Sequence, residues 1–430
     1  MRQNDCVSHA VPLDHIKGNG LEVPKGWRAF IDGGKRQHVS VASHKVSFRS
    51  LGEKIQIAHG EAPVVFAAAV SIVTAMAANR RRHDPWCAMV RRQIFARSAA
   101  TLAALFLLGI PARVHADAVE SFYKGRKVQL VIGYTAGGAY DLYARVLARH
   151  LTRHLPGQPI FIAQNMPGAG SLKAANYLYG IAPQDGSVIG MIGRGLAMEP
   201  LLGDARYDSR NFAWIGSITS EVSVCATWAT APVKTLADMF TQELTVGGEG
   251  SGSDPDAFAL LLRNVFGARI KLVSGYPGGA EINLAMERGE VQGRCGWSWS
   301  SITSRHAAWI KQKKLNFLLQ FALQKDKALA DVPSVLELAK TQEQTEILRL
   351  VLGRQIMGRP VLAPPGTPDD RKQALRRAFD ATMSDPKFVA EAQKAELEIS
   401  PVTGTEIDRL LAELYRTPRD VIEKAARALK

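Results

Sequence analysis

The sequence predicts an α/β protein of two lobes, in which each lobe is a mainly parallel β-sheet flanked by helices. From about residue 117 onward, apolar runs of strand length alternate with segments of helical periodicity. Glycine-rich turns follow several of these apolar runs and precede the helical segments. A repeated strand-helix-strand order of this kind gives parallel strands joined by right-handed crossovers.

The first lobe is expected to begin with the run KVQLVI at 127–132, which is typical of a strand buried on both faces. Apolar residues at helical spacing follow from 142 to 151 and indicate a helix. A second strand is expected at 159–165, a second helix after the glycine turn at 167–171, and a third strand within 183–193.

A second series of elements begins after Ile218. Its expected strands have the sequences SVCATWA, LTVGG, IKLVS, VQGRCGW and LNFLLQFAL, with helices after the second and third. A further strand, QIMGRPVLA, then precedes helices that continue to Lys430. These helices are expected to return to the first lobe. The expected lobe boundaries are 117–218 with 346–430 for lobe 1 and 219–345 for lobe 2.

The formal net charge of the chain is +14, and most of the excess lies before residue 117. The remainder has interspersed charges and no basic stripe with interleaved aromatic residues, so nucleic-acid binding is not expected. Residues 89–116 combine arginines, a short apolar core and a small-residue end at Ala116, as in a cleaved export signal. The protein is therefore expected in the periplasm. Residues 1–88 are interpreted as an extension of doubtful translation without ordered structure.

The chain has four cysteines, of which only Cys225 and Cys295 follow the expected export signal. An oxidising compartment permits one disulfide between them. Because the sequence does not supply the distance between their Cα atoms, two buried free thiols are the preferred interpretation and the disulfide is the alternative.

Enzyme signatures are absent from the sequence: there is no phosphate-binding loop, no HExxH and no GxSxG. His150 and His154 are four residues apart, but without a nearby acidic or cysteine partner in the sequence a solvated helix face is preferred to a metal site. Asp254 and Asp256 flank a proline and are interpreted as a helix N-terminal cap. No catalytic residue, metal or cofactor is expected.

Glycine turns between a strand and a helix recur along the chain. Each presents backbone N–H groups and the positive end of a helix dipole, and four of them, spread over both lobes, predict a cleft that binds an anion from two sides. Arg194 and Arg294, next to glycines after strands, are candidate carboxylate ligands, with a solvated loop arginine as the alternative for each. The four turns are Gly137-Gly138, Gly168–Ser171, Gly250–Ser253 and Gly278-Gly279.

Six segments occur in a characteristic order: GYTAGGAYDLYAR, QNMPGAGSLKAANYL, PQDG, GYPGGAEINLAMERGEV, LADVPSVLEL and LAPPGTP. In this succession the chain resembles the Bug family, the extracytoplasmic solute receptors of tripartite tricarboxylate transporters, over residues 119–430. The resemblance implies a two-lobed periplasmic-binding-protein fold of the Venus flytrap type. It also implies capture of a small carboxylate between the lobes and delivery to the permease subunits of a membrane transporter.

In that family two loops hold a ligand carboxylate, largely through backbone amides and ordered waters. They match residues 135–138 and 276–280, and the aspartate of the first helix matches Asp141. With the turn residues described above, the expected ligand-binding residues are Thr135, Ala136, Gly137, Gly138, Asp141, Gly193, Arg194, Ser251, Ser253, Tyr276, Pro277, Gly278, Gly279, Ala280 and Arg294.

The sequence departs from the family pattern at three places. The first loop lacks the usual prolines, Gln292 replaces an acid, and Arg194 stands in a loop of small residues. A pocket that loses an acid and gains arginines is expected to favour a more anionic or larger ligand, with Trp297 and Trp299 as a candidate aromatic wall.

The leading hypothesis is therefore a non-enzymatic binding protein that acts as a monomer. A periplasmic sensor that presents its bound state to a signalling partner would have the same cleft and is the alternative. An enzyme acting on a carboxylate is disfavoured, because Ser251 and Ser253 lack a histidine in recognisable context.

Overall fold

A computed structural model describes residues 9–10, 28–32, 36–41, 44–48, 118–203 and 205–430. The described strands before residue 49 belong to one compact unit, and the described residues from 118 onward belong to another. The expected export signal at 89–116 lies outside the described residues. No helix among the described residues is long and apolar enough to cross a membrane.

The N-terminal unit contains an antiparallel sheet of order β1-β2-β3-β4. This differs from the expectation that residues 1–88 lack ordered structure. The segments RQHVSV and HKVSF each place apolar residues at alternate positions near their ends, which is a strand pattern that the sequence analysis overlooked. The strands are β1 (His9–Ala10), β2 (Arg28–Asp32), β3 (Arg36–Val41) and β4 (His44–Phe48).

The first lobe is built on a six-stranded sheet of order β15-β8-β14-β7-β5-β6. Its strands are β5 (Lys127–Ile132), β6 (Ile160–Asn165), β7 (Val188–Met191), β8 (Ala213–Ser217), β14 (Pro360–Ala363) and β15 (Val402–Thr403). Strand β5 is parallel to β6 and β7, whereas β14 is antiparallel to both β7 and β8. The α/β class is confirmed, but the sheet is mixed rather than mainly parallel, because β14 joins it only after the chain has returned from the second lobe.

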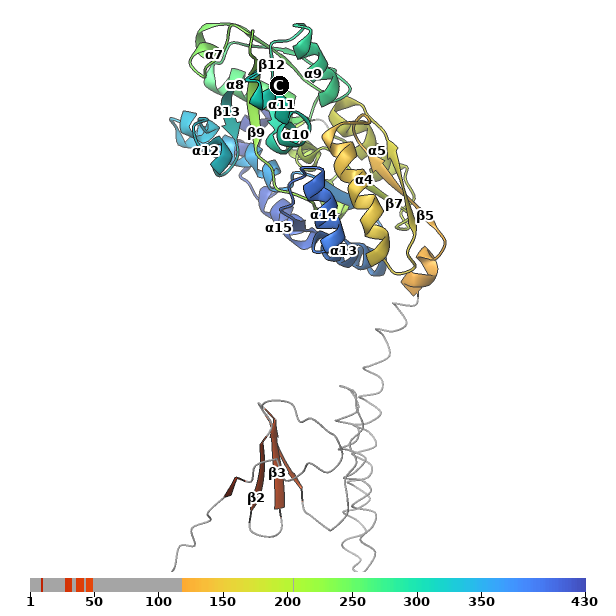
Figure 1. The fold of residues 1–430 in the computed structure, drawn as a ribbon. Coiled ribbons are helices and arrows are strands. Elements are labelled where there is room, and N and C mark those ends of the chain that lie inside the picture. The colour runs from red at the N-terminus through yellow and green to blue at the C-terminus, as the bar shows by residue number, and fades with distance from the viewer. Residues whose placement is uncertain (1–8, 11–27, 33–35, 42–43, 49–117, 204) are drawn as a thin grey trace, which may run out of the picture. The chain divides into compact units, whose positions relative to one another are not determined.

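Helices cover both faces of this sheet (Figure 1). On one face α4, α13 and α14 bury a core that includes Val128, Leu147 and Phe379. On the other face α5 and α15 bury a core that includes Leu178 and Trp214. The helices are α4 (Ala139–Leu151), α5 (Leu172–Gly180), α13 (Asp369–Met383), α14 (Pro386–Lys394) and α15 (Gly404–Leu414).

The second lobe is built on a five-stranded sheet of order β11-β10-β12-β9-β13, which is again mixed because β9 is antiparallel to both of its neighbours. Its strands are β9 (Ser223–Trp228), β10 (Leu244–Gly247), β11 (Ile270–Val273), β12 (Gly293–Ser298) and β13 (Leu315–Phe321). Its helices are α7 (Asp238–Thr241), α8 (Asp254–Phe266), α9 (Gly279–Glu287), α10 (Trp299–Arg305), α11 (Ala307–Lys311) and α12 (Gln342–Leu352). Short connecting helices, described where they are needed, complete the two lobes.

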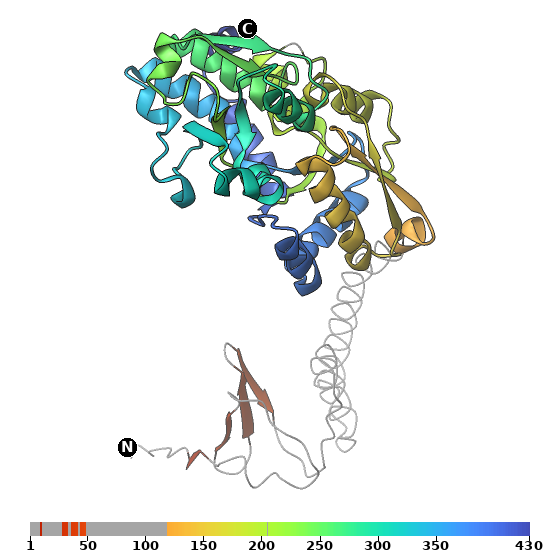
Figure 2. The same ribbon diagram turned by 45° about the horizontal axis from the view of Figure 1, so that its top comes forward.

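The last helix, α16 (Arg419–Ala428), belongs to the second lobe and not to the first. Its Val421 and Ala425 share a core with Phe258 of α8 and Leu348 of α12. In Figures 1 and 2 the C-terminus accordingly lies beside the green elements of the second lobe. The expected boundary at 345/346 therefore differs from the packing, since the amphipathic pattern of a helix does not show which core its apolar face covers.

Two extended segments connect the lobes, one between β8 and β9 and one before β14. They are paired by backbone hydrogen bonds from Gly358 N to Thr219 O (2.7 Å) and from Ile218 N to Arg359 O (3.2 Å). The fully buried guanidinium of Arg359 also forms an ion pair with Glu221 across the two segments (3.1 Å). These two connections are thus cross-linked strands, and a third crossing, the turn between α15 and α16, returns the chain to the second lobe.

Cys225 of β9 and Cys295 of β12 form a disulfide in the second lobe. The preferred interpretation of two free thiols is therefore wrong. Because β9 and β12 are adjacent in the sheet, the two residues lie side by side although they are 70 residues apart in sequence.

The expectation of a solvated helix face for His150 and His154 is also corrected. The His150 ring is buried and lies 2.6 Å from a carboxylate oxygen of Glu391, and His154 lies 2.8 Å from Asp385. Glu391 lies in α14 and Asp385 caps its N-terminus, more than 200 residues later, so their proximity could not be inferred from the sequence. Among the described residues, no group of three or more His, Cys, Asp or Glu side chains could hold a metal ion.

Candidate functional site

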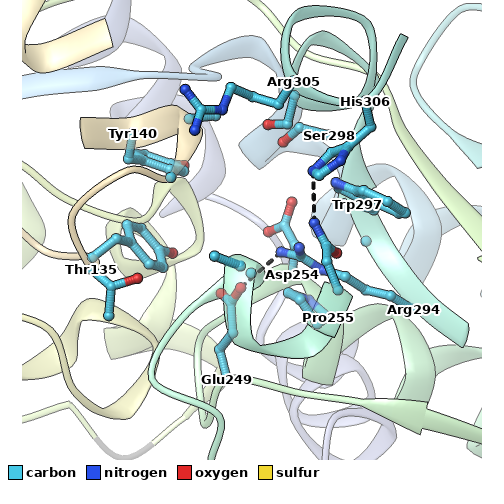
Figure 3. A pocket seen from close by; sticks show the side chains of 18 of the residues that line it. Thr135, Tyr140, Glu249, Asp254, Pro255, Arg294, Trp297, Ser298, Arg305 and His306 are labelled. Atoms are coloured by element: carbon cyan, nitrogen blue, oxygen red, sulfur yellow. Dashed lines mark hydrogen bonds and ion pairs between the residues drawn. The ribbon is translucent and has the colours of Figure 1, made fainter. Parts of the chain in front are cut away.

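A cavity of about 320 Å³ lies between the two lobes. From the first lobe it is lined by the loop between β5 and α4 and by the start of η4 (Arg194–Ala197). From the second lobe it is lined by the starts of α8 and α9, the end of β12, and α10 and α11 (Figure 3). Residues from both lobes thus face one shared space.

The N-termini of two helices meet this cavity from opposite lobes. α4 begins after Gly138 and α9 begins after Gly278, and neither helix is capped by a side chain. The first residues of both helices, Ala139 and Gly279, line the cavity. Backbone N–H groups at uncapped helix starts attract anions, and two such starts facing each other form a site for one negatively charged group.

Asp141 orders the first of these loops and does not line the cavity. Its Oδ2 accepts a hydrogen bond from the backbone N–H of Gly137 (3.0 Å), and its Oδ1 accepts from Arg145 and from Asn165 (2.9 Å each). Asn165 also donates to the carbonyl of Tyr134 (2.9 Å). The carboxylate therefore fixes the shape of the loop, and the amide of Gly137 is not available to a ligand.

Asp256 has the corresponding role in the second lobe. Its Oδ2 accepts hydrogen bonds from the backbone N–H groups of Glu249 (2.6 Å) and Gly250 (3.0 Å) and from the Ser253 hydroxyl (2.8 Å). The Gly250–Ser253 turn thus uses the amides of Gly250 and Ser253 internally, and Gly252 is its one residue that lines the cavity. Ser253 caps α8, and Ser251 donates to Glu199 (2.7 Å), so neither serine lines the cavity.

The Gly168–Ser171 turn is likewise a contact between the lobes rather than part of the cavity. The N–H of Gly170 donates to the carbonyl of Glu249 (2.8 Å). A Cβ atom at Gly170 would lie 2.9 Å from Cβ of Ser253, and the residue has φ +58°. The glycine is required by this close approach of the two lobes, not by a ligand. Three of the four predicted glycine turns therefore contribute lining residues to the cavity, and the Gly250–Ser253 turn does so only through Gly252.

Arg194 lines the cavity, and both of its Nη atoms are engaged by protein groups. Its Nη2 lies 2.5 Å from Oδ2 of Asp254 in the other lobe and donates to Ser223 (2.7 Å), and its guanidinium also bonds Ser298 (3.2 Å). Arg354, in η8 (Gly353–Ile356), lies 3.5 Å from the same Asp254. Asp254 is therefore a buried partner of two arginines and not a helix cap, and Arg194 links the lobes.

Arg294 forms the second charged pair of the cavity, with Glu249 (2.7 Å). Both side chains are buried. Burial raises the pKa of Glu249, and the positive charge of Arg294 opposes this effect. A Cβ atom at Gly279 would lie 2.1 Å from Nη1 of Arg294, so the guanidinium occupies the space beside the first residue of α9 that the glycine leaves open.

These pairings correct the expected charge of the pocket. Arg194 is matched by Asp254 and Arg294 by Glu249, so the arginines do not add a net positive charge to the cavity. Gln292, which replaces an acid of the family pattern, accepts a hydrogen bond from the backbone of Thr245 (3.1 Å) and does not line the cavity.

The expected binding residues divide into two groups. Those that line the cavity are Thr135, Gly137, Gly138, Arg194, Gly279, Ala280 and Arg294; those that do not are Ala136, Asp141, Gly193, Ser251, Ser253, Tyr276, Pro277 and Gly278. Thr135 also donates a hydrogen bond to Glu281 of α9 (3.3 Å), so the two loops approach each other beside the cavity.

The aromatic lining is larger than the sequence indicated. Trp297 lines the cavity as expected, whereas Trp299 packs against Phe317 (centroids 5.4 Å apart). His306 and Trp309, which were not anticipated, line it too and stack on each other (4.2 Å). Their spacing of three residues in the sequence could have suggested a shared face, but not the cavity that this face borders. Tyr134 and Tyr140 complete the aromatic lining from the first lobe.

His306 gives the protein an acid-sensitive element. Burial, together with the positive charges of Arg294 and Arg305, lowers the pKa of His306 to about 4. Between the ordinary pKa of about 6.5 and the lowered value, His306 therefore binds more protons in the unfolded chain than in the folded chain. The free energy of unfolding consequently falls as the pH decreases through that interval.

We expect a His306→Gln variant, which can keep the hydrogen bond to Asn283, to lose less stability than the wild type between pH 7 and pH 4. The measurement is urea unfolding at several pH values. Equal pH slopes of the unfolding free energy for the two proteins would contradict the assignment of a neutral imidazole.

The chain has two α/β lobes joined by paired strands, and helix N-termini from both lobes border the cavity between them. These features define the class of two-lobed solute-binding proteins. The chain belongs to the TctC family, described as the tripartite tricarboxylate transporter family receptor, whose profile matches residues 143–426. It is a Bug-type receptor of this family, and family members are periplasmic binding proteins. The resemblance seen in the sequence is confirmed.

Relatives and solved structures agree with this assignment. A UPF0065 protein from the gbd 5′ region of Cupriavidus necator is 28% identical over 345 residues, covering 78% of this chain and 98% of the relative. The periplasmic binding protein BugD is similar in structure, with a TM-score of 0.57, 19% identity and coverage of 70% of this chain and 98% of BugD. MatC from Rhodopseudomonas palustris, solved with bound malate, has a TM-score of 0.55, 20% identity and coverage of 71% and 99%.

Proposed function

We propose that this protein captures a small carboxylate between its lobes and delivers it to the membrane permease subunits of a tripartite tricarboxylate transporter. The observation that carries the proposal is the pair of uncapped helix N-termini, from α4 and α9, that line one cavity from opposite lobes. A carboxylate there would receive hydrogen bonds from both lobes at once, so that binding would favour their closure.

The charge balance of the cavity supports a specific site for this anion. Because Arg194 and Arg294 are neutralised by buried acids, the attraction for a carboxylate would come mainly from backbone N–H groups and from the part of Arg294 that lines the cavity beside Gly279. The similar protein MatC was solved with malate, and Rpa4515 of R. palustris, with a TM-score of 0.55, was solved with adipate. Both ligands are carboxylates.

The protein would act in the periplasm as a monomeric binding protein, after removal of an export signal ending near Ala116. It would need no catalytic residue, metal or cofactor, because capture and release require only reversible contacts.

Native mass spectrometry of the protein purified gently from its own host tests the proposal. A retained small carboxylate, with a higher melting temperature when the same compound is added back, is the expected result. A protein that retains nothing, and that di-, tri- and aromatic carboxylates do not stabilise, would contradict carboxylate capture. For delivery, loss of uptake of that compound in a strain lacking the receptor is expected, and unchanged uptake would favour a sensor.

A further inference from the structure

Arg305 differs from the other arginines of the cavity. It lies at the end of α10, lines the cavity and is exposed. Within the described part of the chain it makes no ion pair or hydrogen bond, whereas Arg194 and Arg294 are each paired with a buried acid. In Figure 3 its side chain extends over the cavity, with the guanidinium on the side of Tyr140. It is therefore a cation whose charge is free to meet a ligand.

A rigid aromatic wall lies next to Arg305. The His306 and Trp309 rings stack with an interplanar angle of 28°, and Trp297 meets both rings edge-on at 5.4 and 6.2 Å. Trp228 packs edge-on against the far side of this cluster, 4.8 Å from Trp309. Because these rings hold one another, the wall offers a flat, weakly polar surface whose shape is set before a ligand arrives.

The other unpaired charge among the described lining residues, Glu287, also favours the Arg305 side of the cavity for a second anionic group of the ligand. Glu287, in the last turn of α9, lines the cavity and makes no ion pair with any described residue. A second anionic group on a ligand would be repelled by Glu287 and attracted by Arg305. The guanidinium of an arginine can bind a carboxylate through two parallel hydrogen bonds.

We propose that Arg305 is a specificity-determining residue that binds a second carboxylate, so that the site selects dicarboxylates with a flat body over the matching monocarboxylates. The inference rests on the proposed function, because the first carboxylate is placed at the N-termini of α4 and α9. The flat body packs on the wall of His306 and Trp309, and the second carboxylate reaches the guanidinium of Arg305.

Calorimetric titration of the full chain with two matched ligand pairs tests this inference. The pairs are benzoate with terephthalate, and hexanoate with adipate. The variants are Arg305→Gln, Arg305→Lys and, as a matched control, Arg349→Gln, which removes an exposed arginine of α12 that does not line the cavity.

We expect the wild type to bind terephthalate more tightly than benzoate. Arg305→Gln should weaken terephthalate binding at least about tenfold and change benzoate binding less than about twofold. Arg305→Lys should keep part of the preference for terephthalate over benzoate, and the control variant Arg349→Gln should keep all of it. If Arg305 had a purely structural role, Arg305→Gln would weaken the binding of both ligands of a pair by the same factor.

Several results would overturn the inference: equal wild-type affinity for both members of each pair, a preference that survives Arg305→Gln, or a parallel loss for mono- and dicarboxylate. If adipate binds as tightly as terephthalate, only the role of the flat aromatic wall is overturned. Binding of none of the four compounds would overturn the inference. The compound retained by the purified protein would then decide separately whether carboxylate capture itself still holds.

Discussion

Replacing Arg194 with alanine is expected to lower the free energy of unfolding by about 3 kcal/mol or more, because it leaves a buried carboxylate without its closest partner. Arg194 and Asp254 are 3% and 7% exposed and 2.5 Å apart, and they join the two lobes. The arginine at 3.5 Å, Arg354, is too distant to replace the lost contact. The measurement is urea unfolding monitored by tryptophan fluorescence.

Two further variants make this prediction specific. Arg210→Ala removes an arginine from a surface pair with Asp208 and should change stability by less than about 1 kcal/mol. The double variant Arg194→Ala/Asp254→Ala should lose less stability than the sum of the two single variants, since the buried carboxylate is removed together with its closest partner. Additive losses, or an Arg194→Ala effect as small as that of the surface control, would show that the pair does not hold the lobes together.

Replacing Gly279 with alanine is expected to weaken carboxylate binding about tenfold or more and to lower the free energy of unfolding by roughly 1–3 kcal/mol. The added Cβ would lie 2.1 Å from Nη1 of Arg294, so the guanidinium must move away from the start of α9 and from Glu249. Alanine itself is favourable in a helix, so the lost stability should come from the displaced ion pair and not from α9.

Gly180→Ala is the matched control for this change. Gly180 is the last residue of α5, away from the cavity, and a Cβ atom there has no neighbour within 4 Å. Calorimetric titration with the carboxylate that the purified protein retains compares the two variants. Equal affinities of Gly279→Ala and Gly180→Ala would contradict the placement of the ligand beside α9.

Much of the fold could be predicted because its elements have strong local patterns. KVQLVI forms β5 over its whole length, and the expected second helix corresponds to α5. The strand β8 is not predicted by the sequence, because AWIGS is short and lies directly before Ile218, where the second series is expected to begin. The antiparallel insertions of β9 and β14 and the docking of α16 depend on long-range packing, which a local pattern does not encode.

The candidate site was only partly predictable for a related reason. The glycines before α4 and α9 could be recognised, because the requirement for an open backbone at a helix start is local. The partners of the charged residues could not, since Arg194 and Asp254 are 60 residues apart in sequence and meet only when the lobes come together. The hydrogen bonds from the backbone N–H groups of Glu249 and Gly250 to Asp256 could not be inferred from the sequence either.

The central claim is that one carboxylate is held between the N-termini of α4 and α9. A crystal structure of the protein with the carboxylate that it retains tests this claim most directly. The account predicts carboxylate oxygens within hydrogen-bond distance of backbone N–H groups at Gly138 or Ala139 and at Gly279 or Ala280. A carboxylate bound elsewhere in the cavity, with both helix starts facing water or the apolar end of the ligand, would contradict it.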